Sequence, residues 1–321
     1  MRARNAGPSR LRLFAATMTA KTYEPCPAHR VAFLGLGTMG YPMAGHLARA
    51  GHRVTVYSRT AAKAQRWVGE FGGHAATSPR AAVADAQIVF TCVGNDDDLR
   101  SVALGPDGAF AGMTPEAVLC DHTTASARLA RELAQEAARA GLDFVDAPVS
   151  GGETGAVNGM LTVMCGGAAA AFARAQPVMS AFARAVALIG PSGSGQLAKM
   201  VNQITVAGIV QSLAEGINFG VAAGLDMKLV LAVIGKGAAQ SWQLDNRGTT
   251  MLEDRFDFGF AVDWMRKDLG LCLDEARRNG APLPVVALID QFYADLQAMQ
   301  GGRWDTSSLI RRLHRARTAQ G

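Results

Sequence analysis

The feature that most constrains the fold is an alternation of strand-like and helix-like segments from residue 30 onward. Short apolar runs rich in strand-forming residues ("RVAFLGLG", "HRVTVYSR", "AQIVFTCVG", "EAVLCDHTT", "LDFVDAPVS") are interspersed with helical patterns such as "ASARLARELAQEAARAG". Strands that alternate with helices pair in parallel, because each crossover returns the chain to the same end of the sheet. The sequence therefore predicts a doubly wound, mostly parallel α/β sheet.

The pattern changes near residue 193, after which the chain shows long helical stretches and no convincing strand. A chain of 321 residues with 49% hydrophobic and 18% charged residues can fill two ordinary globular domains. We expect a disordered basic tail over residues 1–28, an α/β domain over residues 29–192 and an all-α domain over residues 193–321. A long helix that begins near residue 193 is expected to join the two domains.

The net charge of the chain lies almost entirely in its N-terminal segment. Residues 1–30 contain six arginine or lysine residues and one glutamate, which accounts for the whole net charge of +5. The remainder sums to zero, so we expect no nucleic-acid partner. The N-terminal segment lacks the apolar stretch of a secretory signal, and Met18 offers an alternative start. No apolar run reaches the roughly 18 residues needed to cross a bilayer, so no membrane partner is expected either.

The cysteines and histidines give no sign of a metal site. The five cysteines are an odd number, and none lies in a CxxC or Cys/His cluster with metal-ligand spacing. Three of them end apolar strand-like runs, which is typical of buried, reduced thiols in a cytoplasmic protein. His122 is the only histidine near a motif, and we expect it to have a structural or surface role. The sequence therefore predicts no metal and a cytoplasmic location.

The first chemical motif is "GLGTMG", which places three glycines at GxGxxG spacing after a predicted strand and before a predicted helix. In the first βαβ unit of such a sheet, these glycines allow a tight turn and a close approach of the backbone to a pyrophosphate. Glycine used for turn geometry alone is the alternative. The motif predicts a dinucleotide-binding Rossmann domain whose phosphate loop consists of Gly35, Leu36, Gly37, Thr38, Met39 and Gly40.

The end of the second predicted strand indicates the choice of cofactor. An acidic residue about 20 positions after the first glycine would hold the ribose hydroxyls of NAD. The sequence instead has Ser58, Arg59 and Thr60 in this region. A guanidinium and two hydroxyls suit a 2′-phosphate, which a carboxylate would repel. We therefore predict NADP(H) in preference to NAD(H), the alternative being a solvated arginine after a strand.

A second glycine-rich motif, "DAPVSGGETGAVNGML", follows a later predicted strand. Ser150, Gly151 and Gly152 leave the strand end on the side where α/β sheets bind ligands. Consecutive glycines expose backbone N–H groups that can form an anion-binding concavity, and the serine adds a hydroxyl donor. The motif suits a small carboxylate, although a Ser-Gly-Gly turn can also be only a turn.

The third motif, "GSGQLAKMVNQI", opens the long apolar helix. Lys199 and Asn202 lie three residues apart and therefore share a helix face. A solvated lysine is the ordinary interpretation, because burying a lysine is costly. The position of Lys199 after a dinucleotide-binding domain and a candidate anion loop favours a functional role.

Together with "KDLGL" at residues 267–271, these motifs resemble the β-hydroxyacid dehydrogenase family over about residues 30–315. The family includes 3-hydroxyisobutyrate dehydrogenases, tartronate semialdehyde reductases and glyoxylate/succinic semialdehyde reductases. The resemblance implies a Rossmann domain, an all-helical domain joined by one long helix, and an active site between them. It also implies a homodimer or homotetramer built through the helical domain.

The resemblance assigns roles to residues that match the family's motifs. Lys199 matches the catalytic lysine, and Lys267 matches a lysine that reaches the cofactor. The matches to substrate-binding positions are Asn202, Ser150, Gly151, Gly152 and Thr124, the last of which also lies near the nicotinamide.

The sequence departs from the family's pattern at three positions. Val93 and Gly94 replace a Leu-Pro pair beside the cofactor, and Gln203 replaces a second asparagine in the substrate site. In "GKGAAQSWQLDNRG", Trp242 is a candidate pocket residue and Arg247 a candidate partner for a second carboxylate. Both also have a bland interpretation, as a core residue and a surface charge.

The predicted reaction is the NADP(H)-dependent interconversion of a small β-hydroxy acid and its semialdehyde or keto acid. Hydride transfer to a carbonyl creates a developing alkoxide, which the Lys199 ammonium can stabilise and protonate. An imine reductase of the same architecture is one alternative, although such enzymes generally replace this lysine. A non-catalytic NADP-binding relative is the other.

Overall fold

A computed structural model describes residues 21–318, and the chain divides into two compact units between Lys199 and Met200. The units are considered separately below. Residues 1–20, most of the predicted tail, lie outside the described residues.

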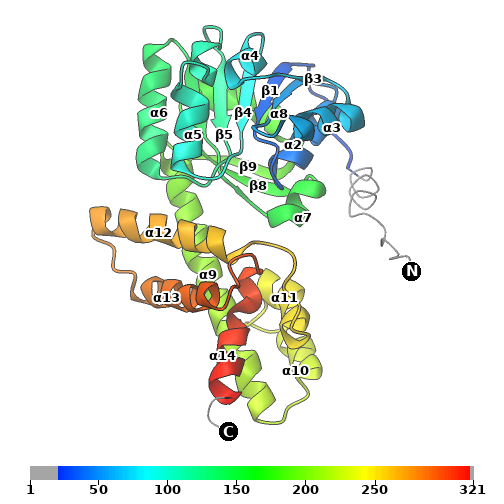
Figure 1. Cartoon of the computed structure of the whole chain (residues 1–321), viewed down its shortest axis with the longest axis vertical. Helices are drawn as coiled ribbons and strands as arrows, with labels where there is room; N and C mark the ends of the chain where they lie inside the picture. Colours follow the sequence, from blue (N-terminus) through cyan, green and yellow to red (C-terminus); the bar gives the residue numbers. More distant parts are fainter. Residues whose placement is uncertain (1–20, 319–321) are drawn as a thin grey trace, which may run out of the picture. The chain divides into compact units, whose positions relative to one another are not determined.

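Unit 1 is built on one nine-stranded sheet with the order β3-β2-β1-β4-β5-β6-β8-β7, in which β9 pairs with β8 (Figure 1). The pairs from β3 through β6 are parallel, as the alternation of strands and helices predicts. The strands are β1 (Arg30–Leu34), β2 (Arg53–Tyr57), β3 (His74–Ala75), β4 (Ile88–Thr91), β5 (Val118–Asp121), β6 (Asp143–Asp146), β7 (Val149–Ser150), β8 (Leu161–Gly167) and β9 (Ala183–Gly190).

The end of the sheet that contains β7, β8 and β9 mixes parallel and antiparallel pairs. β8 runs antiparallel to β6 and to the two-residue β7, whereas β9 runs parallel to β8. The segment "LDFVDAPVS", predicted as one strand, is split into β6 and β7, and Ser150 ends the second of them.

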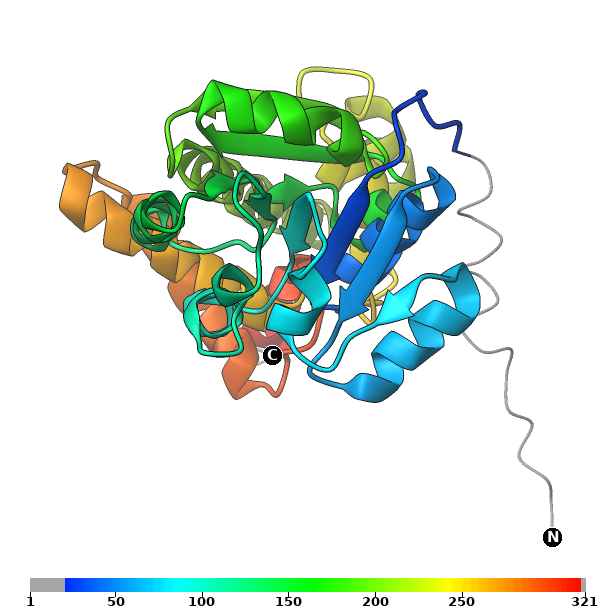
Figure 2. The same cartoon turned by 90° about the horizontal axis from the view of Figure 1, so that it is seen from above.

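Helices cover both faces of this sheet (Figure 2). One core contains side chains from α2, α3 and α8, and the other contains side chains from α4, α5 and α6. The helices of unit 1 are α2 (Gly40–Arg49), α3 (Ala61–Phe71), α4 (Pro79–Val83), α5 (Asp96–Leu104), α6 (Ala127–Arg139), α7 (Gly152–Val157) and α8 (Ala169–Met179), with the 3₁₀ turn η2 (Ala109–Ala111).

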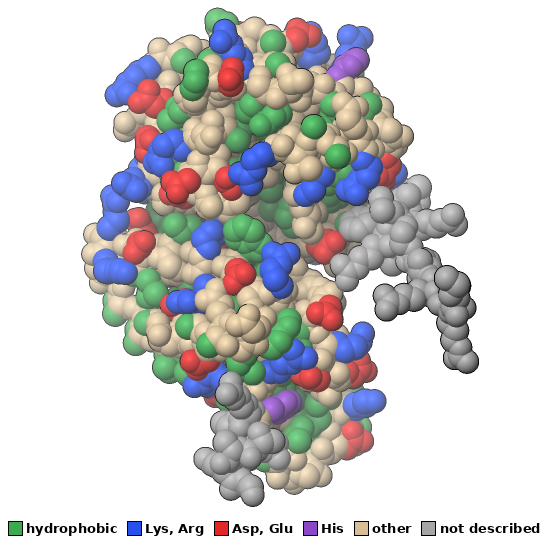
Figure 3. Space-filling view, viewed as in Figure 1, with side chains coloured by type: hydrophobic (Ala, Val, Ile, Leu, Met, Phe, Trp, Pro, Cys, Tyr) green, Lys and Arg blue, Asp and Glu red, His purple; other side chains and the backbone are tan. Residues whose placement is uncertain are grey.

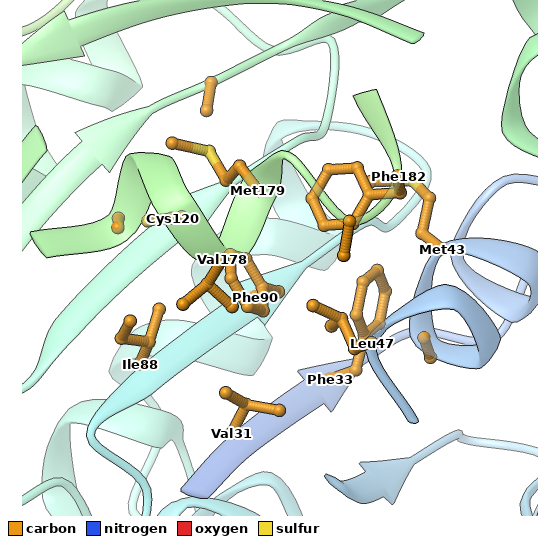
Figure 4. Packing of buried hydrophobic residues seen from close by; sticks show 14 of the residues in the cluster. Val31, Phe33, Met43, Leu47, Ile88, Phe90, Cys120, Val178, Met179 and Phe182 are labelled. Atoms are coloured by element: carbon orange, nitrogen blue, oxygen red, sulfur yellow. The ribbon is translucent and has the colours of Figure 1, made fainter. Parts of the chain in front are cut away.

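The central strand β1 shows why its sequence is apolar without interruption. Val31 and Phe33 point into one core, and Ala32 and Leu34 point into the other. Successive side chains of a strand face opposite sides, so a strand covered on both faces needs apolar residues at every position. In the first core, the ring of Phe33 lies 6.1 Å from that of Phe90 in β4, near Leu47 of α2 (Figure 4).

Residues 21–28 pack on unit 1, which corrects the prediction that they belong to a disordered tail. The Lys21 ammonium donates hydrogen bonds to the backbone oxygens of Ser180 (3.1 Å) and Ala183 (3.0 Å), and also to that of Gly159. The Tyr23 hydroxyl lies 2.8 Å from Nδ1 of the buried His46. The part of the predicted tail that the structure describes is therefore anchored by polar contacts.

Unit 2 has only helices as regular elements among the described residues, as predicted, apart from one isolated β-bridge between Ala261 and Asp305. Its core includes Tyr293, Met251 and Val262, which are fully buried. The elements are α9 (Ser194–Ala222), whose first turns belong to unit 1, α10 (Met227–Ile234), α11 (Trp242–Leu252), α12 (Val262–Asn279), α13 (Pro284–Ala298), η3 (Thr306–Ser308) and α14 (Leu309–Thr318).

The sequence predicts no segment that is long and apolar enough to cross a bilayer, but helix α9 is such a segment by length and composition. Among the described residues it is the single helix that passes by length and composition, and 33% of its most apolar 18-residue window is buried. Core helices of soluble proteins pass the same test, so one such helix is weak evidence for a membrane span.

Candidate functional site

The predicted cofactor loops follow neighbouring parallel strands and therefore meet at one edge of the sheet. β2, β1, β4, β5 and β6 are adjacent in that order, and their carboxyl ends point the same way. Ligands of open α/β sheets bind outside this edge. The glycine loop follows β1, and the segments 58–60, 93–94 and 122–126 follow β2, β4 and β5.

The three glycines of the β1–α2 loop differ in what their surroundings require. Gly35 has φ +102°, and a β-carbon there would lie 2.3 Å from the Cys92 carbonyl oxygen. A β-carbon on Gly40 would lie 2.0 Å from the Gly35 carbonyl oxygen. A β-carbon on Gly37 would meet no atom within 4 Å.

Packing of the chain against itself explains Gly35 and Gly40 but not Gly37. A dinucleotide-binding loop needs its middle glycine because the pyrophosphate passes close to the backbone. The open space at Gly37 therefore fits a bound dinucleotide, and glycine used for turn geometry alone does not account for this position.

Arg59 follows β2 as predicted, and its side chain is 85% exposed. Its Nη1 donates a 2.9 Å hydrogen bond to Oδ1 of Asp98, in the first turn of α5. The region after β2 has no carboxylate in sequence, but the fold brings one to the guanidinium from a distant segment. Ser58 is half-buried and Thr60 is exposed at the start of α3.

The loops after β4 and β5 are joined by a buried polar cluster. Asp121 Oδ1 accepts hydrogen bonds from the Thr91 hydroxyl (2.7 Å) and the Thr123 N–H (3.1 Å). The Thr123 hydroxyl in turn accepts from the N–H of Val93 (3.0 Å), next to Gly94. Burial raises the pKa of Asp121 to about 7, against which these hydrogen bonds act only partly. The cluster fixes Val93 relative to the loop that carries Thr124.

The Ser150–Gly152 segment turns sharply between β7 and α7. Gly151 and Gly152 have φ +127° and +61°, in the region that favours glycine. Both are exposed, Ser150 is half-buried, and a β-carbon on Gly152 would meet no atom within 4 Å. The backbone at this turn is therefore open to a ligand, as a carboxylate site requires.

Helix α9 begins on the carboxylate of Asp146, the last residue of β6. Asp146 Oδ1 accepts a 2.7 Å hydrogen bond from the N–H of Gly193, and Oδ2 accepts a 2.9 Å bond from the N–H of Gln196. An acidic group is favourable at a helix N-terminus because the first N–H groups lack intrahelical partners. A β-carbon on Gly195 would lie 2.5 Å from the Asp146 carbonyl oxygen, so the helix start approaches the strand closely.

Lys199 lies in the second turn of α9 and is only 7% exposed. This burial contradicts the ordinary interpretation of a solvated surface lysine. Burying an ammonium is costly unless the charge is compensated, so this lysine is held inside the fold rather than solvated at its surface.

The other predicted site residues of α9 and α12 form a polar chain within unit 2. The Asn202 amide donates to Gln203 Oε1 (2.7 Å), and Gln203 Nε2 donates to Asp268 Oδ2 (2.7 Å). Lys267 Nζ lies 3.1 Å from the other oxygen of Asp268. Gln203 is 4% exposed and Asp268 is 2% exposed. Asp268, which was not predicted as a site residue, therefore links Gln203 to Lys267, and Gln203 in turn bonds to Asn202.

Trp242 and Arg247 contact each other on α11. The Arg247 guanidinium lies 4.8 Å from the centre of the Trp242 ring and 4.9 Å from that of Phe258, and its Nε donates to the buried Asp305 (3.1 Å). Arg247 was predicted as a partner for a second carboxylate of the substrate, and in the structure it already pairs with a carboxylate of the chain itself, that of Asp305. Trp242 is 50% exposed, so it is not a core residue.

His122 is structural, in line with its expected role. It is 2% exposed, its Nδ1 lies 2.7 Å from the Ala147 carbonyl oxygen, and its ring stacks on Phe90. Burial lowers its pKa to about 4. Among the described residues, no group of three or more His, Cys, Asp or Glu side chains could hold a metal ion.

Three polar residues at these sites escaped the sequence-based assignment: Asp98, Gln196 and Asp268. Asp98 has no signal of its own in sequence, since its importance depends on a segment about 40 residues away. Gln196 lies within the third motif, "GSGQLAKMVNQI", but its hydrogen-bond partners lie about 70 residues away. Asp268 follows Lys267 directly in the recognised "KDL" motif, so the motif could have pointed to it.

The parallel strand order and the glycine loop define a dinucleotide-binding protein of the doubly wound class. Two family models match the chain. The model described as the NAD binding domain of 6-phosphogluconate dehydrogenase covers residues 30–190. The model described as "NAD-binding of NADP-dependent 3-hydroxyisobutyrate dehydrogenase" covers residues 193–313.

Individual relatives agree with the family models. An uncharacterized oxidoreductase of Shewanella frigidimarina is 60% identical over 289 residues, which are 90% of this chain and 99% of that protein. A 3-hydroxyisobutyrate dehydrogenase of Pseudomonas aeruginosa is 35% identical over 82% of this chain and 91% of its own length. The solved structure of Mycobacterium tuberculosis 3-hydroxyisobutyrate dehydrogenase with L-serine has a TM-score of 0.81 at 31% identity, covering 89% of this chain and 99% of that one.

The chain belongs to the β-hydroxyacid dehydrogenase family. It is thus a member of a family of NAD(P)-dependent hydroxyacid dehydrogenases.

Proposed function

We propose that this chain is an NADP(H)-dependent 3-hydroxyacid dehydrogenase or semialdehyde reductase with Lys199 as its general acid and base. The observation that carries the proposal is the burial of Lys199, which is only 7% exposed. It lies one helical turn after Gln196, whose side chain forms hydrogen bonds with the loop that contains Thr124. The open space at Gly37 lies at the same sheet edge and fits a dinucleotide.

The cofactor would supply or accept a hydride when bound. The residues that would hold it are the glycine loop around Gly37, Val93 and Gly94 after β4, and Thr124 after β5. Lys267 keeps the cofactor role that the family resemblance implies. Backbone N–H groups at the start of α2 would face the pyrophosphate, because the first N–H groups of a helix are unpaired.

In reduction, a substrate carbonyl develops negative charge on its oxygen as hydride adds to its carbon. The Lys199 ammonium would stabilise this oxygen and transfer a proton to it, which leaves a neutral amine. In oxidation the neutral amine would take the hydroxyl proton back. The N–H groups at Gly151 and Gly152 and the hydroxyl of Ser150 would hold the substrate carboxylate, together with Asn202.

Two of the substrate assignments are proposed with different roles. Trp242 is half-exposed and offers an aromatic surface to substrate, stiffened by its stacking against Arg247. Gln203 has both ends of its amide bonded within the chain. We therefore assign it to orienting Asn202 as well as to the substrate site.

NADP(H) preference is supported by Arg59 and by the hydroxyls of Ser58 and Thr60. A 2′-phosphate would replace Asp98 as the partner of the exposed guanidinium and gain a charge-assisted bond. Arg59→Asp should shift the ratio of kcat/KM for NADPH and NADH toward NADH by at least tenfold. Arg53→Asp, at an exposed arginine at the opposite end of β2, is the matched control. An unchanged ratio in Arg59→Asp would remove Arg59 from the cofactor site.

We also propose a homodimer or homotetramer in the cytoplasm. Unit 2 exposes large apolar side chains on α9 and α10, including Phe219 (73%), Leu229 (63%) and Val233 (63%). Apolar patches of this kind commonly mark contacts between proteins. On the face seen in Figure 3, acidic and basic side chains are interspersed.

The function is tested by NADPH oxidation over small aldehydes, keto acids and cyclic imines. We expect turnover of one or more carboxylate-bearing aldehydes or keto acids. Lys199→Ala should lower kcat by at least a hundredfold with less than a threefold change in NADPH affinity, and Lys228→Ala, at an exposed lysine, is the control. Turnover of imines alone would instead establish the imine reductase. A protein that binds NADPH but turns over nothing would be a non-catalytic relative.

A further inference from the structure

The carboxamide of Gln196 joins the start of α9 to the loop between β5 and α6. Its Oε1 accepts a 3.1 Å hydrogen bond from the N–H of Ala125, and its Nε2 donates a 2.8 Å bond to the carbonyl oxygen of Thr123. Gln196 is fully buried, with 0% of its surface exposed. Thr124 lies between the two bonded residues, so the amide grips the loop on either side of it.

The same glutamine is close to Lys199 along the helix. Residues three apart share a helix face, so Gln196 and Lys199 point to the same side of α9 in successive turns. The backbone N–H of Gln196 is held separately by Asp146 Oδ2 at 2.9 Å. The first turn of α9 is therefore fixed both to the end of β6 and to the loop after β5.

Starting the helix does not require this side chain. Asp146 already caps the N-terminus through Gly193 and Gln196, and a helix start needs no further partner on the 122–126 loop. The two loop bonds have opposite polarity, since one is accepted and the other donated. Of the uncharged side chains of this length, only glutamine supplies both an acceptor and a donor.

We propose that Gln196 is a positioning residue that sets the place of Thr124 relative to the Lys199 ammonium. The inference rests on the proposed role of Lys199 as general acid and base. A general acid must lie within hydrogen-bond reach of the atom that it protonates, and a misplacement of about 1 Å can cost roughly a hundredfold in rate. Because one buried amide fixes both the loop and the helix turn that carries the lysine, the distance between Thr124 and the Lys199 ammonium stays constant while substrate and cofactor enter and leave.

The sharpest test keeps the acceptor and makes the donor depend on pH. In Gln196→Glu, a protonated carboxyl can still accept from Ala125 and donate to the Thr123 carbonyl. An ionised carboxylate would present a second acceptor to that carbonyl and repel it. We compare the kcat of Gln196→Glu with that of wild type at the same pH. This ratio should be within threefold of one at pH 5.5 and at least tenfold lower at pH 9. The KM for NADPH should stay within threefold of the wild-type value at every pH. A ratio that does not vary with pH would overturn the proposal.

Two further variants separate positioning from general stability. Gln196→Met has a similar shape without either bond, and should lower kcat at least tenfold at every pH. Gln196→Asn keeps the amide on a shorter stem, and should recover part of this loss. The matched control is Gln211→Met on the same helix, which removes a buried amide bonded to Glu215 and should leave kcat within twofold. Equal losses in Gln196→Met and Gln211→Met would reduce Gln196 to a structural role.

Hydrogen exchange tests the grip on the loop without any activity. The Ala125 amide should exchange at least tenfold faster in Gln196→Met than in wild type, whereas the Gly193 amide, held by Asp146, should change little. Unchanged protection of Ala125 would refute the grip itself. Failure of the proposed function looks different, because wild type would then show no turnover or Lys199→Ala would retain it.

Discussion

Asp121 makes the stability of unit 1 depend on pH in a way that one substitution can isolate. The side chain is 1% exposed, and burial raises its pKa from 3.8 to about 7. Its Oδ2 is buried without a hydrogen-bond partner. In the unfolded chain the same carboxyl titrates near its ordinary value.

The sign follows from this difference in pKa. A carboxyl whose pKa is raised in the folded state favours folding while both states are protonated, below about pH 4. This contribution is lost as the pH rises from about 4 through about 7, because the unfolded chain has then released its proton while the folded chain still holds it. A shift of roughly 3 units at about 1.4 kcal/mol each gives a loss of about 4 kcal/mol between pH 4 and pH 8.

Asp121→Asn removes this titration and keeps Oδ1 as the acceptor for Thr91 and Thr123. The added amide hydrogens would lack partners, which costs about 1–3 kcal/mol independently of pH. We therefore expect the free energy of unfolding of the variant, relative to wild type, to improve by about 2–3 kcal/mol from pH 5 to pH 8, because part of the loss in wild type has already occurred by pH 5.

Urea unfolding followed by circular dichroism at several pH values measures this difference. Asp85→Asn, at a side chain that is 83% exposed, is the control and should give a difference that varies little with pH. A constant offset between Asp121→Asn and wild type across this range would refute the reasoning. It would mean that Asp121 ionises in the folded chain as easily as in the unfolded one.

Two further predictions concern the glycine loop and the N-terminal anchor. Gly37→Ala should leave the free energy of unfolding within about 0.5 kcal/mol, because its β-carbon meets open space, yet weaken dinucleotide binding at least tenfold in a fluorescence titration. Gly40→Ala, with its β-carbon 2.0 Å from a carbonyl oxygen, should destabilise the fold itself; equal stability of the two variants would contradict the assignment. Lys21→Met should cost about 1–3 kcal/mol in urea unfolding, because the backbone oxygens of Gly159, Ser180 and Ala183 lose their donor. Lys63→Met, at an exposed position, is its control, and an unchanged midpoint for Lys21→Met would show that the anchor adds nothing.

The local pattern of the sequence determined the fold class, the family and the helix position of Lys199. The apolar run of β1, the glycine spacing after it and the change to long helices near residue 193 are properties of neighbouring residues, so they can be read without coordinates. They predicted the doubly wound sheet, the helical second unit and, with the order of the four motifs, the family. The same pattern placed Lys199 in the second turn of a long helix.

Tertiary structure decided what those residues contact. Only the fold shows that Lys199 is buried, that Asp98 reaches Arg59, and that Arg247 already has a carboxylate partner in Asp305. Residues 21–28 were predicted as tail because the N-terminal arm is basic, rich in Arg, Ala, Ser and Thr, and lacks a long apolar run, but Lys21 is held by carbonyls about 140–160 residues away. The bonds of Gln196 likewise join segments about 70 residues apart. Hydrogen bonds between distant segments leave no period or spacing in a single sequence, so their partners become visible only when the chain is folded.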